Sequence, residues 1–492
     1  MNVVETELKF QVPAGSRKSV QRAIATTSAR SIRLQARYYD TPDRRLAGAG
    51  LALRLRMEGP RWVQALKGAG TSALHRLEHE VQLEASDAEP QLDLARHAGT
   101  PAAQALAEAL GDGAEGLRVV YETRVLRTRR SVRSAGAVIE LAFDVGEVVA
   151  GDRSLPLCEI EFELKRGPLQ GLLALAAQWV QRHRLWLDVR SKAERGDRLA
   201  RGVDAGPAVQ ARRPVLRADM SSDTALRTIV GACLAQVLPN AADVAAGAGT
   251  AEHVHQLRVG LRRLRSALRV FGDGATATES AWASGLTDLF ARLGVARDRD
   301  VLVETVLPEL QASGAPLTEL PPAVDAADAG EALRGVACNR LLLELISFAE
   351  ATPPDDAGQQ VPFGKLARSK IRRMRRRLKA DAAAFTTLDD AGRHHTRRRV
   401  KRLRYSLEFV ASLHSSSTVE PSLATVRNAQ DVLGRYNDLA IAERAFRAQA
   451  DKDPHAWFAV GWLVARRAQL VPDAAQALKA LAEAPRLRRK RK

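Results

Sequence analysis

The sequence predicts a multidomain α+β protein: an antiparallel β-barrel of eight strands, followed by an all-α part of two duplicated antiparallel helical bundles. Residues 1–203 contain short segments in which charged and apolar residues alternate, separated by turn residues. Residues 215–485 follow the helical period and repeat a basic pattern. Residues 204–214 contain glycine and proline without periodicity and are the expected linker.

Composition narrows the range of partners. The 492 residues include 75 Lys and Arg against 57 Asp and Glu, a net charge of +18, which favours a polyanionic partner. The three cysteines Cys158, Cys233 and Cys338 are far apart and show no metal-binding spacing, as expected in a reducing compartment. The N-terminus has no apolar signal region, and no apolar run is long enough to span a membrane. We therefore expect a soluble cytoplasmic protein with no membrane partner.

The first expected strand, residues 4–10, places Glu5, Glu7 and Lys9 on one face and mainly apolar residues on the other. Two carboxylates and an ammonium are costly to place against an apolar core. This face therefore meets water, a metal or a charged ligand. A solvated strand face is the simpler alternative for this segment alone.

The same alternation recurs along the chain. A helix is expected near residues 16–25, and further strands over 37–40, 51–57, 62–67, 77–83, 121–132, 138–149 and 158–164. Their polar faces carry Arg54, Arg56, Lys67, Arg76, Glu78, Glu80, Glu140, Asp144, Glu159, Glu161 and Glu163. A barrel with a charged lumen leaves the apolar faces outside, against a core of their own. Carboxylates can hold Mg²⁺ or Mn²⁺, and Arg and Lys can hold phosphate oxygens, so the pattern favours phosphoryl transfer.

Residues Glu5-Thr6-Glu7-Leu8-Lys9 match the ExExK signature of the CYTH domain, the triphosphate tunnel metalloenzymes. The segments at 38–42, 53–56, 65–67, 158–161 and 191–192 follow the order of that family. The resemblance covers residues 1–203 and implies an eight-stranded tunnel that binds a triphosphate and a divalent metal, Mg²⁺ or Mn²⁺. Ala65 stands where relatives often carry Thr.

The resemblance also implies roles for individual residues. The implied metal or water-positioning carboxylates are Glu5, Glu7, Glu78, Glu80, Asp144, Glu159 and Glu161, with the choice between Glu78 and Glu80 open. The implied substrate-binding cations are Lys9, Arg54, Arg56, Lys67, Arg76, Arg124 and Lys192, and the implied catalytic residues are Glu5, Glu7, Lys9 and Lys67. Glu163 and Arg127 are expected to support them.

In the helical part, an apolar stripe that begins at Leu257 lies beside a cationic stripe. The cationic residues are His255, Arg258, Arg262, Arg263, Arg265 and Arg269. The pattern recurs in His394, Arg397, Lys401, Arg402 and Arg404, and the Leu293-Gly294 pair followed by Asp298 recurs as Leu433-Gly434 followed by Asp438. We interpret this as an internal duplication.

A third basic helix aligns Lys365, Arg368, Arg372, Arg375 and Lys379 on one face. Solvated helix faces are the alternative for any single row, but like charges at this spacing are mutually destabilising unless a ligand neutralises them. The duplicated pattern resembles the CHAD domain over residues 215–485, which implies polyphosphate binding in a groove between basic stripes. Residues 486–492 are expected to form a basic tail.

Together the two resemblances are to bacterial CYTH-CHAD inorganic triphosphatases. They imply hydrolysis of tripolyphosphate to pyrophosphate and phosphate, polyphosphate binding by the helical part, and association with polyphosphate granules. Two alternatives stay open: a noncatalytic polyphosphate-granule protein, and a CYTH-type adenylate cyclase acting on ATP. Nucleic acid is a less favoured partner, because aromatic residues make up 4% of the chain and do not alternate with the basic stripes.

Overall fold

The structure is a computed structural model that describes residues 3–70, 74–84, 89–111, 116–272, 277–294, 302–316, 329–351, 361–485 and 487–488. The chain divides into two compact units. The first contains Met1–Val209, Val237–Val254 and Gly330–Ala351, and the second contains Gln210–Gln236, His255–Ala329 and Thr352–Lys492. Residues 205–217, which include most of the expected linker, form neither helix nor strand. Most of the expected basic tail lies outside the described residues.

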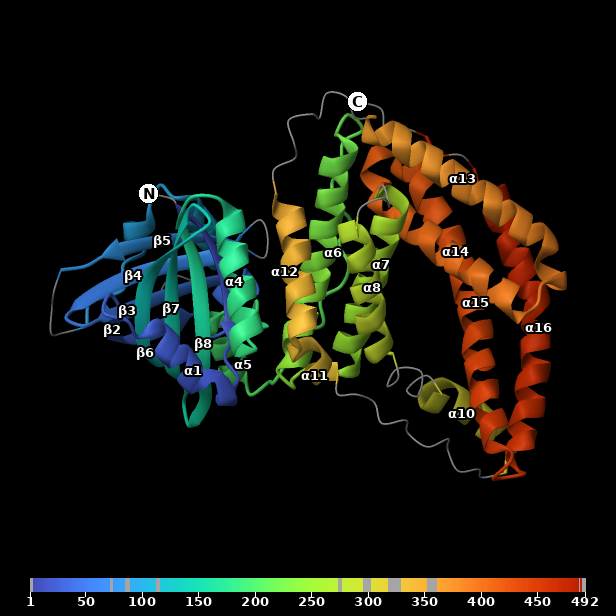
Figure 1. The fold of residues 1–492 in the computed structure, drawn as a ribbon, viewed down its shortest axis with the longest axis horizontal. Coiled ribbons are helices and arrows are strands. Elements are labelled where there is room, and N and C mark those ends of the chain that lie inside the picture. Colours follow the sequence, from blue (N-terminus) through green and yellow to red (C-terminus); the bar gives the residue numbers. More distant parts are fainter. Residues whose placement is uncertain are drawn as a thin grey trace. The chain divides into compact units, whose positions relative to one another are not determined.

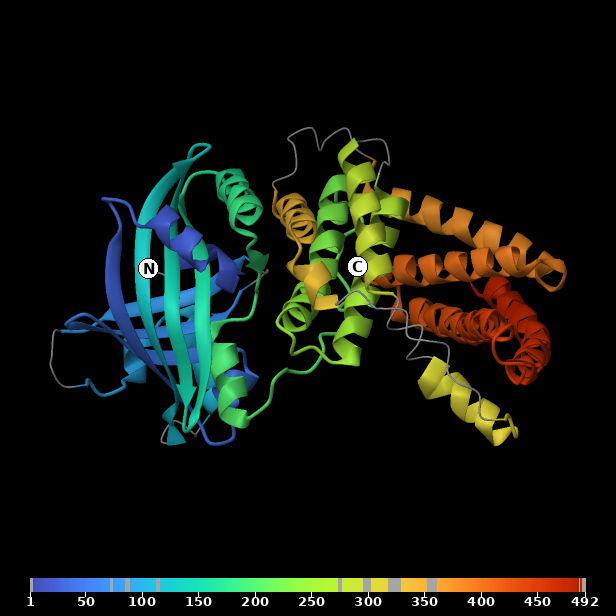
Figure 2. The same cartoon turned by 60° about the horizontal axis from the view of Figure 1, so that its bottom comes forward.

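An antiparallel sheet of nine strands forms the body of the first unit (Figure 1). Its strands are β1 (Val3–Gln11), β2 (Arg30–Asp40), β3 (Leu51–Glu58), β4 (Arg61–Ala69), β5 (His75–Gln82), β6 (Arg118–Ser134), β7 (Ala137–Ala150), β8 (Arg153–Arg166) and β9 (Trp186–Leu187). Their order is β5-β4-β3-β2-β6-β7-β8-β1-β9, and β1 also pairs with β5. This last pairing joins the two sides of the sheet, so that β1 to β8 enclose an interior (Figure 2).

The outer face of this closed sheet is apolar and is covered by helices. Helices α2 (Arg45–Gly48) and α3 (Pro101–Leu110) pack on Leu53 and Leu66 of β3 and β4. Helix α4 (Leu169–His183) packs on β7 and β8, where the rings of Trp179 and Phe162 meet edge to face at 5.7 Å. Because side chains alternate along a strand, covering one face with helices turns the charged residues toward the interior.

Helix α5 (Lys192–Arg201) lies against the interior face of β6, β7 and β8. Its first turn begins at Ser191, whose hydroxyl accepts a hydrogen bond from the Glu194 backbone N–H at 3.0 Å. Gly196 allows the close approach, because a Cβ there would lie 2.2 Å from the Tyr121 ring. Apolar residues of α5 complete a cluster with Leu34, Ala36, Tyr38, Tyr121, Val125, Val148, Ala150 and Leu157.

Two later segments of the chain belong to the same unit. Helix α12 (Val336–Glu350) packs along α4, and the Asn339 carboxamide oxygen accepts a hydrogen bond from the Leu187 N–H at 2.7 Å. The end of α6 (Ser222–Ala245), α11 (Ala329–Arg334) and the start of α7 (Ala251–Phe271) complete it. Among the described residues, α6 is long and apolar enough to cross a membrane, but 72% of its most apolar stretch is buried in the protein, as in a core helix.

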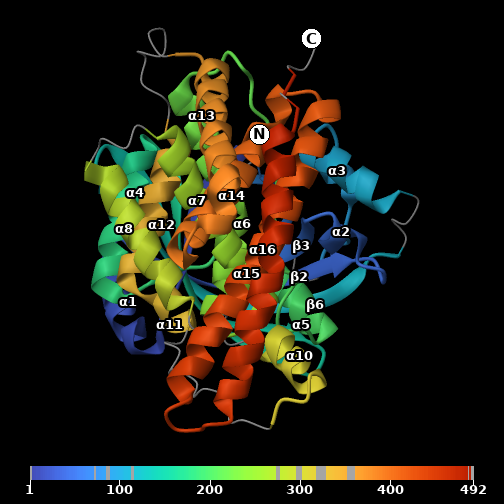
Figure 3. The ribbon, with the colours of Figure 1, turned by 90° about the vertical axis from the view of Figure 1, so that its right-hand side faces the viewer.

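The second unit is helical. Besides parts of α6 and α7 it contains α8 (Ala277–Arg292), α10 (Leu307–Ala312), α13 (Phe363–Ala384), α14 (Asp390–Phe409), α15 (Ser416–Gln449) and α16 (Ala456–Glu483). Helices α15 and α16 run side by side over an apolar cluster that includes Leu439 and Phe446 (Figure 3). Phe271 at the end of α7 contacts the rings of Phe363 and Phe409 at 5.2 and 6.5 Å.

The structure confirms the predicted antiparallel sheet and the mostly helical second half. Every strand expected from the alternation corresponds to one of β1 to β8. The two-residue strand β9 and the helices α2, α3, α4 and α5 were missing from the prediction, because short apolar runs without strict alternation do not distinguish strand from helix.

Candidate phosphate and metal site

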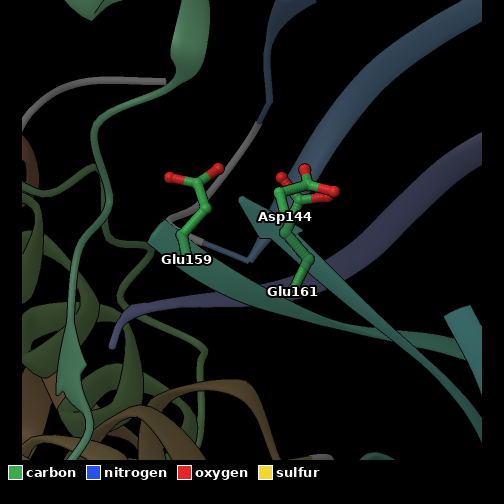
Figure 4. Close-up of side chains that lie close together, drawn as sticks. All are labelled: Asp144, Glu159 and Glu161. Atoms are coloured by element: carbon green, nitrogen blue, oxygen red, sulfur yellow. The ribbon is translucent and has the colours of Figure 1, made fainter. Parts of the chain in front are cut away.

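Three carboxylates meet on the interior face of β7 and β8. Asp144 and Glu159 are directly opposite in the antiparallel register, and Glu161 lies two residues further along β8. Each offers one oxygen, and these oxygens lie within 4.8 Å of one another (Figure 4). Asp144 and Glu159 are fully buried. A buried set of carboxylate oxygens is the donor chemistry that Mg²⁺ and Mn²⁺ prefer, so these residues fit a divalent metal.

Fixed cations surround this carboxylate cluster. The Lys192 ammonium lies 2.8 Å from Asp144, 2.5 Å from Glu159 and 2.7 Å from Glu161. Arg127 contacts Asp144 and Glu161, each at 2.6 Å. Burial opposes ionisation of Glu159, but Arg195 and Lys192 outweigh it and lower its pKa to about 2. Burial likewise opposes the charge on Lys192, and the three carboxylates together raise its pKa.

A second charged group lies on β3, β4 and β5. Arg54 donates to Glu80 at 3.2 Å and to the Tyr38 hydroxyl at 3.2 Å, and it lies 3.7 Å from Glu78. Lys67 pairs with Glu78 at 2.7 Å. Burial opposes the charge on Lys67, but Glu78, Glu5 and Glu7 together raise its pKa.

Arg56 completes this group and contacts Glu80 at 3.0 Å. Burial and the neighbouring Arg54 lower the pKa of Arg56. Two adjacent guanidiniums that disfavour each other's charge are suited to a polyanionic ligand.

Strand β1 lies between these two groups. Glu5 contacts Lys67 at 3.4 Å. Lys9 is opposite Glu161 and Glu7 opposite Glu163 in the register with β8. The buried Lys9 ammonium donates a hydrogen bond to the Arg190 carbonyl. The three charged residues of the first strand therefore face the same interior as the carboxylate cluster and the Arg pair.

The structure does not bring Arg124 to this site. Arg124 lies on the opposite face of β6 from Arg127, its side chain is 54% exposed, and it pairs with Glu122 at 3.1 Å. Side chains three positions apart on a strand point to opposite faces, so only Arg127 reaches the interior. The backbone of Arg76 pairs with Glu5, while its side chain lies outside the described residues.

Sequence reasoning missed two groups at the site. Arg195 is paired with the buried Glu159, and Tyr38 bonds to Arg54. Arg195 stands three positions after Lys192, on the same face of α5, so recognising the helix would have identified it. The pairs also distinguish the two candidate carboxylates of β5: Glu78 is buried and contacts Lys67, whereas the exposed Glu80 lies between Arg54 and Arg56.

In the second unit, the basic rows of α7 and α14 influence each other electrostatically. Burial, Arg262 and Arg397 lower the pKa of Lys401 to about 6. Burial, Arg269 and Arg398 lower the pKa of Arg402 to about 10. Like charges from two helices are therefore concentrated on one partly buried surface, which favours an anionic ligand.

Two predicted members of this surface are buried and donate to groups inside the helical domain. Arg263 is 1% exposed, donates to Gln236 and to the Arg212 carbonyl at 3.0 Å each, and stacks on Phe409. Arg258 is also buried and donates to the Leu293 carbonyl at 2.5 Å. Both side chains are buried for the same reason: a guanidinium at the margin of an apolar stripe can fold back into the core when carbonyls are available there.

The remaining predicted residues vary in exposure. Arg262 and Arg265 are half-buried over the Phe290 ring, with guanidinium carbons 5.8 and 5.6 Å from its centre. The exposed ones are Arg269, Lys365, Arg368, Arg372, Lys379 and His394, and the half-buried ones include His255, Arg397 and Arg404. Arg375 of α13 donates to the carbonyls of Ala484 and Pro485.

In both repeats an arginine of the basic row contacts the segment that follows it in the repeated pattern, but through different partners. At the end of α8, Leu293 accepts from Arg258 of α7. In α15, Asp438 lies 4.0 Å from Arg397, and Asn437 bonds to His394 at 3.0 Å. The position predicted to match Asp438 in the first repeat, Asp298, lies outside the described residues.

Residues 4–196 match the CYTH domain family, and residues 228–447 match the CHAD domain family. A curated relative, the inorganic triphosphatase of Haemophilus influenzae, is 32% identical over 162 residues; the match spans 32% of this chain and 44% of the relative's own length.

Two solved structures resemble parts of the chain. The CHAD domain of Ricinus communis is 30% identical, with a TM-score of 0.48, and the match covers 58% of this chain and all of that domain. A Hippeastrum protein, assigned as an adenylyl cyclase and reported to have a dominant triphosphatase activity, is 17% identical, with a TM-score of 0.30. That match covers 40% of this chain and 96% of the Hippeastrum protein.

The two family matches do not overlap, and they follow the order of the sheet and the helical half. The match to the CYTH family and the triphosphatase relative support, at the level of the family, the assignment of this chain as a hydrolase. The chain therefore carries a CYTH domain followed by a CHAD domain.

Proposed function

We propose that the interior of the closed sheet hydrolyses tripolyphosphate to pyrophosphate and phosphate with the help of a divalent metal. The observation that supports this most strongly is the presence of two complementary groups in one interior. The carboxylate cluster of β7 and β8 offers metal ligands. The buried cations Arg54 and Lys9, and Lys192 with its side chain 10% exposed, offer partners for phosphate oxygens.

The cations would bind and orient the substrate. Arg54 and Arg56 present neighbouring planar guanidiniums, which suit two oxygens of one phosphate. Lys67 and Lys9 add single positive charges. Because the negative charge of a phosphoryl group is redistributed over its oxygens during transfer, cations fixed at these positions stabilise the transition state without having to reorganise.

The metal ligands in this proposal are Asp144, Glu159 and Glu161, with the protein's choice between Mg²⁺ and Mn²⁺ left to experiment. A bound metal would neutralise phosphate charge and polarise the phosphoryl group. Glu78 and Glu80 are held by Lys67 and the Arg pair, and we assign them to positioning those cations.

Hydrolysis then needs water on the terminal phosphorus. The water oxygen bonds to that phosphorus, the bond to the bridging oxygen breaks, and pyrophosphate leaves. Glu5 and Glu7 on β1 are the carboxylates that would orient this water and accept its proton. They project into the same interior as Lys9.

For the helical half we propose binding of inorganic polyphosphate along the basic surface of α7 and α14. Contacts to a flexible chain of phosphates accumulate, as they do on a nucleic-acid backbone. The depressed pKa of Lys401 supports an anionic ligand, because it reflects burial beside Arg262 and Arg397. DNA that displaces polyphosphate at equal phosphate concentration would contradict selectivity for polyphosphate.

Product analysis separates this proposal from its alternatives. With tripolyphosphate and Mg²⁺ or Mn²⁺, phosphorus NMR of the products is expected to show one pyrophosphate for each phosphate released. Cyclic AMP formed from ATP, with tripolyphosphate left intact, would instead identify a cyclase. No turnover of either substrate, with polyphosphate still bound, would identify a noncatalytic protein of polyphosphate granules.

A further inference from the structure

A buried aspartate of helix α6 contacts two arginines that lie next to residues of the phosphate and metal site. Asp243, near the end of α6, is 3% exposed and lies within the segment that matches the CHAD family. It nevertheless belongs to the first compact unit. Its oxygens accept hydrogen bonds from two guanidiniums, Arg190 at 3.3 Å and Arg198 at 2.5 and 3.2 Å.

Arg190 connects Asp243 with β1. Its guanidinium makes a two-point contact with Asp188, at 2.9 Å for each bond, and its carbonyl accepts the hydrogen bond of the Lys9 ammonium. Asp188 also accepts from Gln11 at 2.9 Å. The position of residues 188–190 therefore fixes the position of the Lys9 ammonium.

Arg198 connects Asp243 with α5. This helix carries Lys192 and Arg195, which hold the carboxylate cluster, on the turns before Arg198. Arg198 is buried and also bonds to Glu194 at 2.5 Å. A charge held against α5 at this point resists rotation or sliding of the helix, and either motion would displace Lys192.

We infer that Asp243 is a positioning residue for the phosphate and metal site: it anchors Arg190 and Arg198, and through them fixes Lys9 and helix α5. This inference rests on the proposed function for its catalytic consequence. It also means that the matched CYTH segment alone, residues 4–196, lacks two of the groups that order its own interior, Arg198 and Asp243.

The test uses the full-length protein with three substitutions. Asp243→Asn keeps the shape and removes the charge, Asp243→Glu keeps the charge, and Asp223→Asn is the matched control, because Asp223 pairs with Arg227 at 2.5 Å on the same helix. We expect Asp243→Asn to lower kcat on tripolyphosphate about ten- to a hundredfold, the scale of a 1 Å misplacement, with KM within about threefold. Asp243→Glu should recover part of the loss, and Asp223→Asn should behave as the wild type.

Amide hydrogen exchange supplies a readout that does not depend on turnover. We expect Asp243→Asn to speed exchange across residues 186–201 and to leave β3 and β4 unchanged. A wild-type kcat in Asp243→Asn, or an equal loss in the Asn and Glu variants, would overturn the inference. If the wild-type protein hydrolyses no triphosphate, the proposed function fails, and hydrogen exchange alone tests the positioning role of Asp243. Unchanged exchange at residues 186–201 in Asp243→Asn would then overturn that role. Faster exchange confined to these residues would support it.

Discussion

The ammonium of Lys192 donates a hydrogen bond of 2.7 Å to Glu161, although the lysine begins helix α5 and the glutamate lies in strand β8. The same ammonium contacts Asp144 and Glu159. Lys192 is thus a cation that all three carboxylates share, whereas Arg127 contacts two of them and Arg195 contacts one. A divalent metal bound to these carboxylates would compete with Lys192 for the same oxygens.

This competition leads to a prediction for Lys192→Met. Removing the ammonium leaves the carboxylates without their shared cation, so Mn²⁺ should bind roughly tenfold more tightly or better, while turnover of tripolyphosphate falls. Calorimetric titration with Mn²⁺ measures the first effect. Weaker Mn²⁺ binding in the variant would contradict the assignment of this cluster as the metal site.

A second prediction compares two arginines of one strand. Arg127→Ala removes a buried guanidinium that contacts Asp144 and Glu161, so kcat/KM for tripolyphosphate should fall about a hundredfold or more. Arg124→Ala alters an exposed side chain on the other face and should change kcat/KM less than twofold. Steady-state kinetics on both proteins, with thermal unfolding as a check on folding, tests the pair. A larger loss for Arg124→Ala would contradict the interior site.

These two arginines show how much of the site can be predicted from the sequence. Period-two alternation correctly placed the charges of β1, β3 and β8 on one face, because a strand in register has only two faces. The choice of Arg124 over Arg127 followed the resemblance and not the alternation. The structure also adds Arg195, which follows Lys192 at a helical spacing on α5, and Asp243, whose contacts come from a late segment of the chain that no local pattern reveals.

The helical half shows a second limit. Periodicity identified the basic row of α7, and the pKa of Lys401 indicates that rows from two helices lie close together. It did not separate Arg263 from Arg262, since adjacent arginines at the edge of an apolar stripe look alike in sequence. Arg263 is buried because its guanidinium reaches buried acceptors, the Gln236 side chain and the Arg212 carbonyl.

A third prediction uses that pair. The double variant Arg262→Ala, Lys401→Ala should weaken polyphosphate binding about tenfold or more at low salt and leave turnover of tripolyphosphate unchanged. Arg263→Ala should instead lower the free energy of unfolding by about 2 to 4 kcal/mol, because it leaves Gln236 and a carbonyl without their buried donor. Binding titrations and denaturant unfolding separate the two effects. Unchanged polyphosphate affinity in the double variant would remove the α7–α14 surface as the binding site.

A fourth prediction concerns pH. Burial, Arg262 and Arg397 lower the pKa of Lys401 to about 6, so this side chain is largely neutral at pH 8 and charged at pH 5. A polyanion favours the charged form, and binding therefore takes up a proton above pH 6. Polyphosphate affinity should consequently decrease as the pH rises from about 6 to 8, and this dependence should be reduced in Lys401→Met. Equal slopes in the two proteins would show that Lys401 does not titrate in the complex.

The most direct measurement is phosphate release from tripolyphosphate, ATP and thiamine triphosphate by the full-length protein with Mg²⁺, Mn²⁺ or EDTA. We predict metal-dependent release from tripolyphosphate well above that from the other two substrates. The same activity should be abolished in Glu5→Gln and in Lys9→Ala, while both variants keep wild-type polyphosphate binding. Release that persists in EDTA, or in either variant, would contradict the proposed metal-dependent hydrolysis inside the closed sheet.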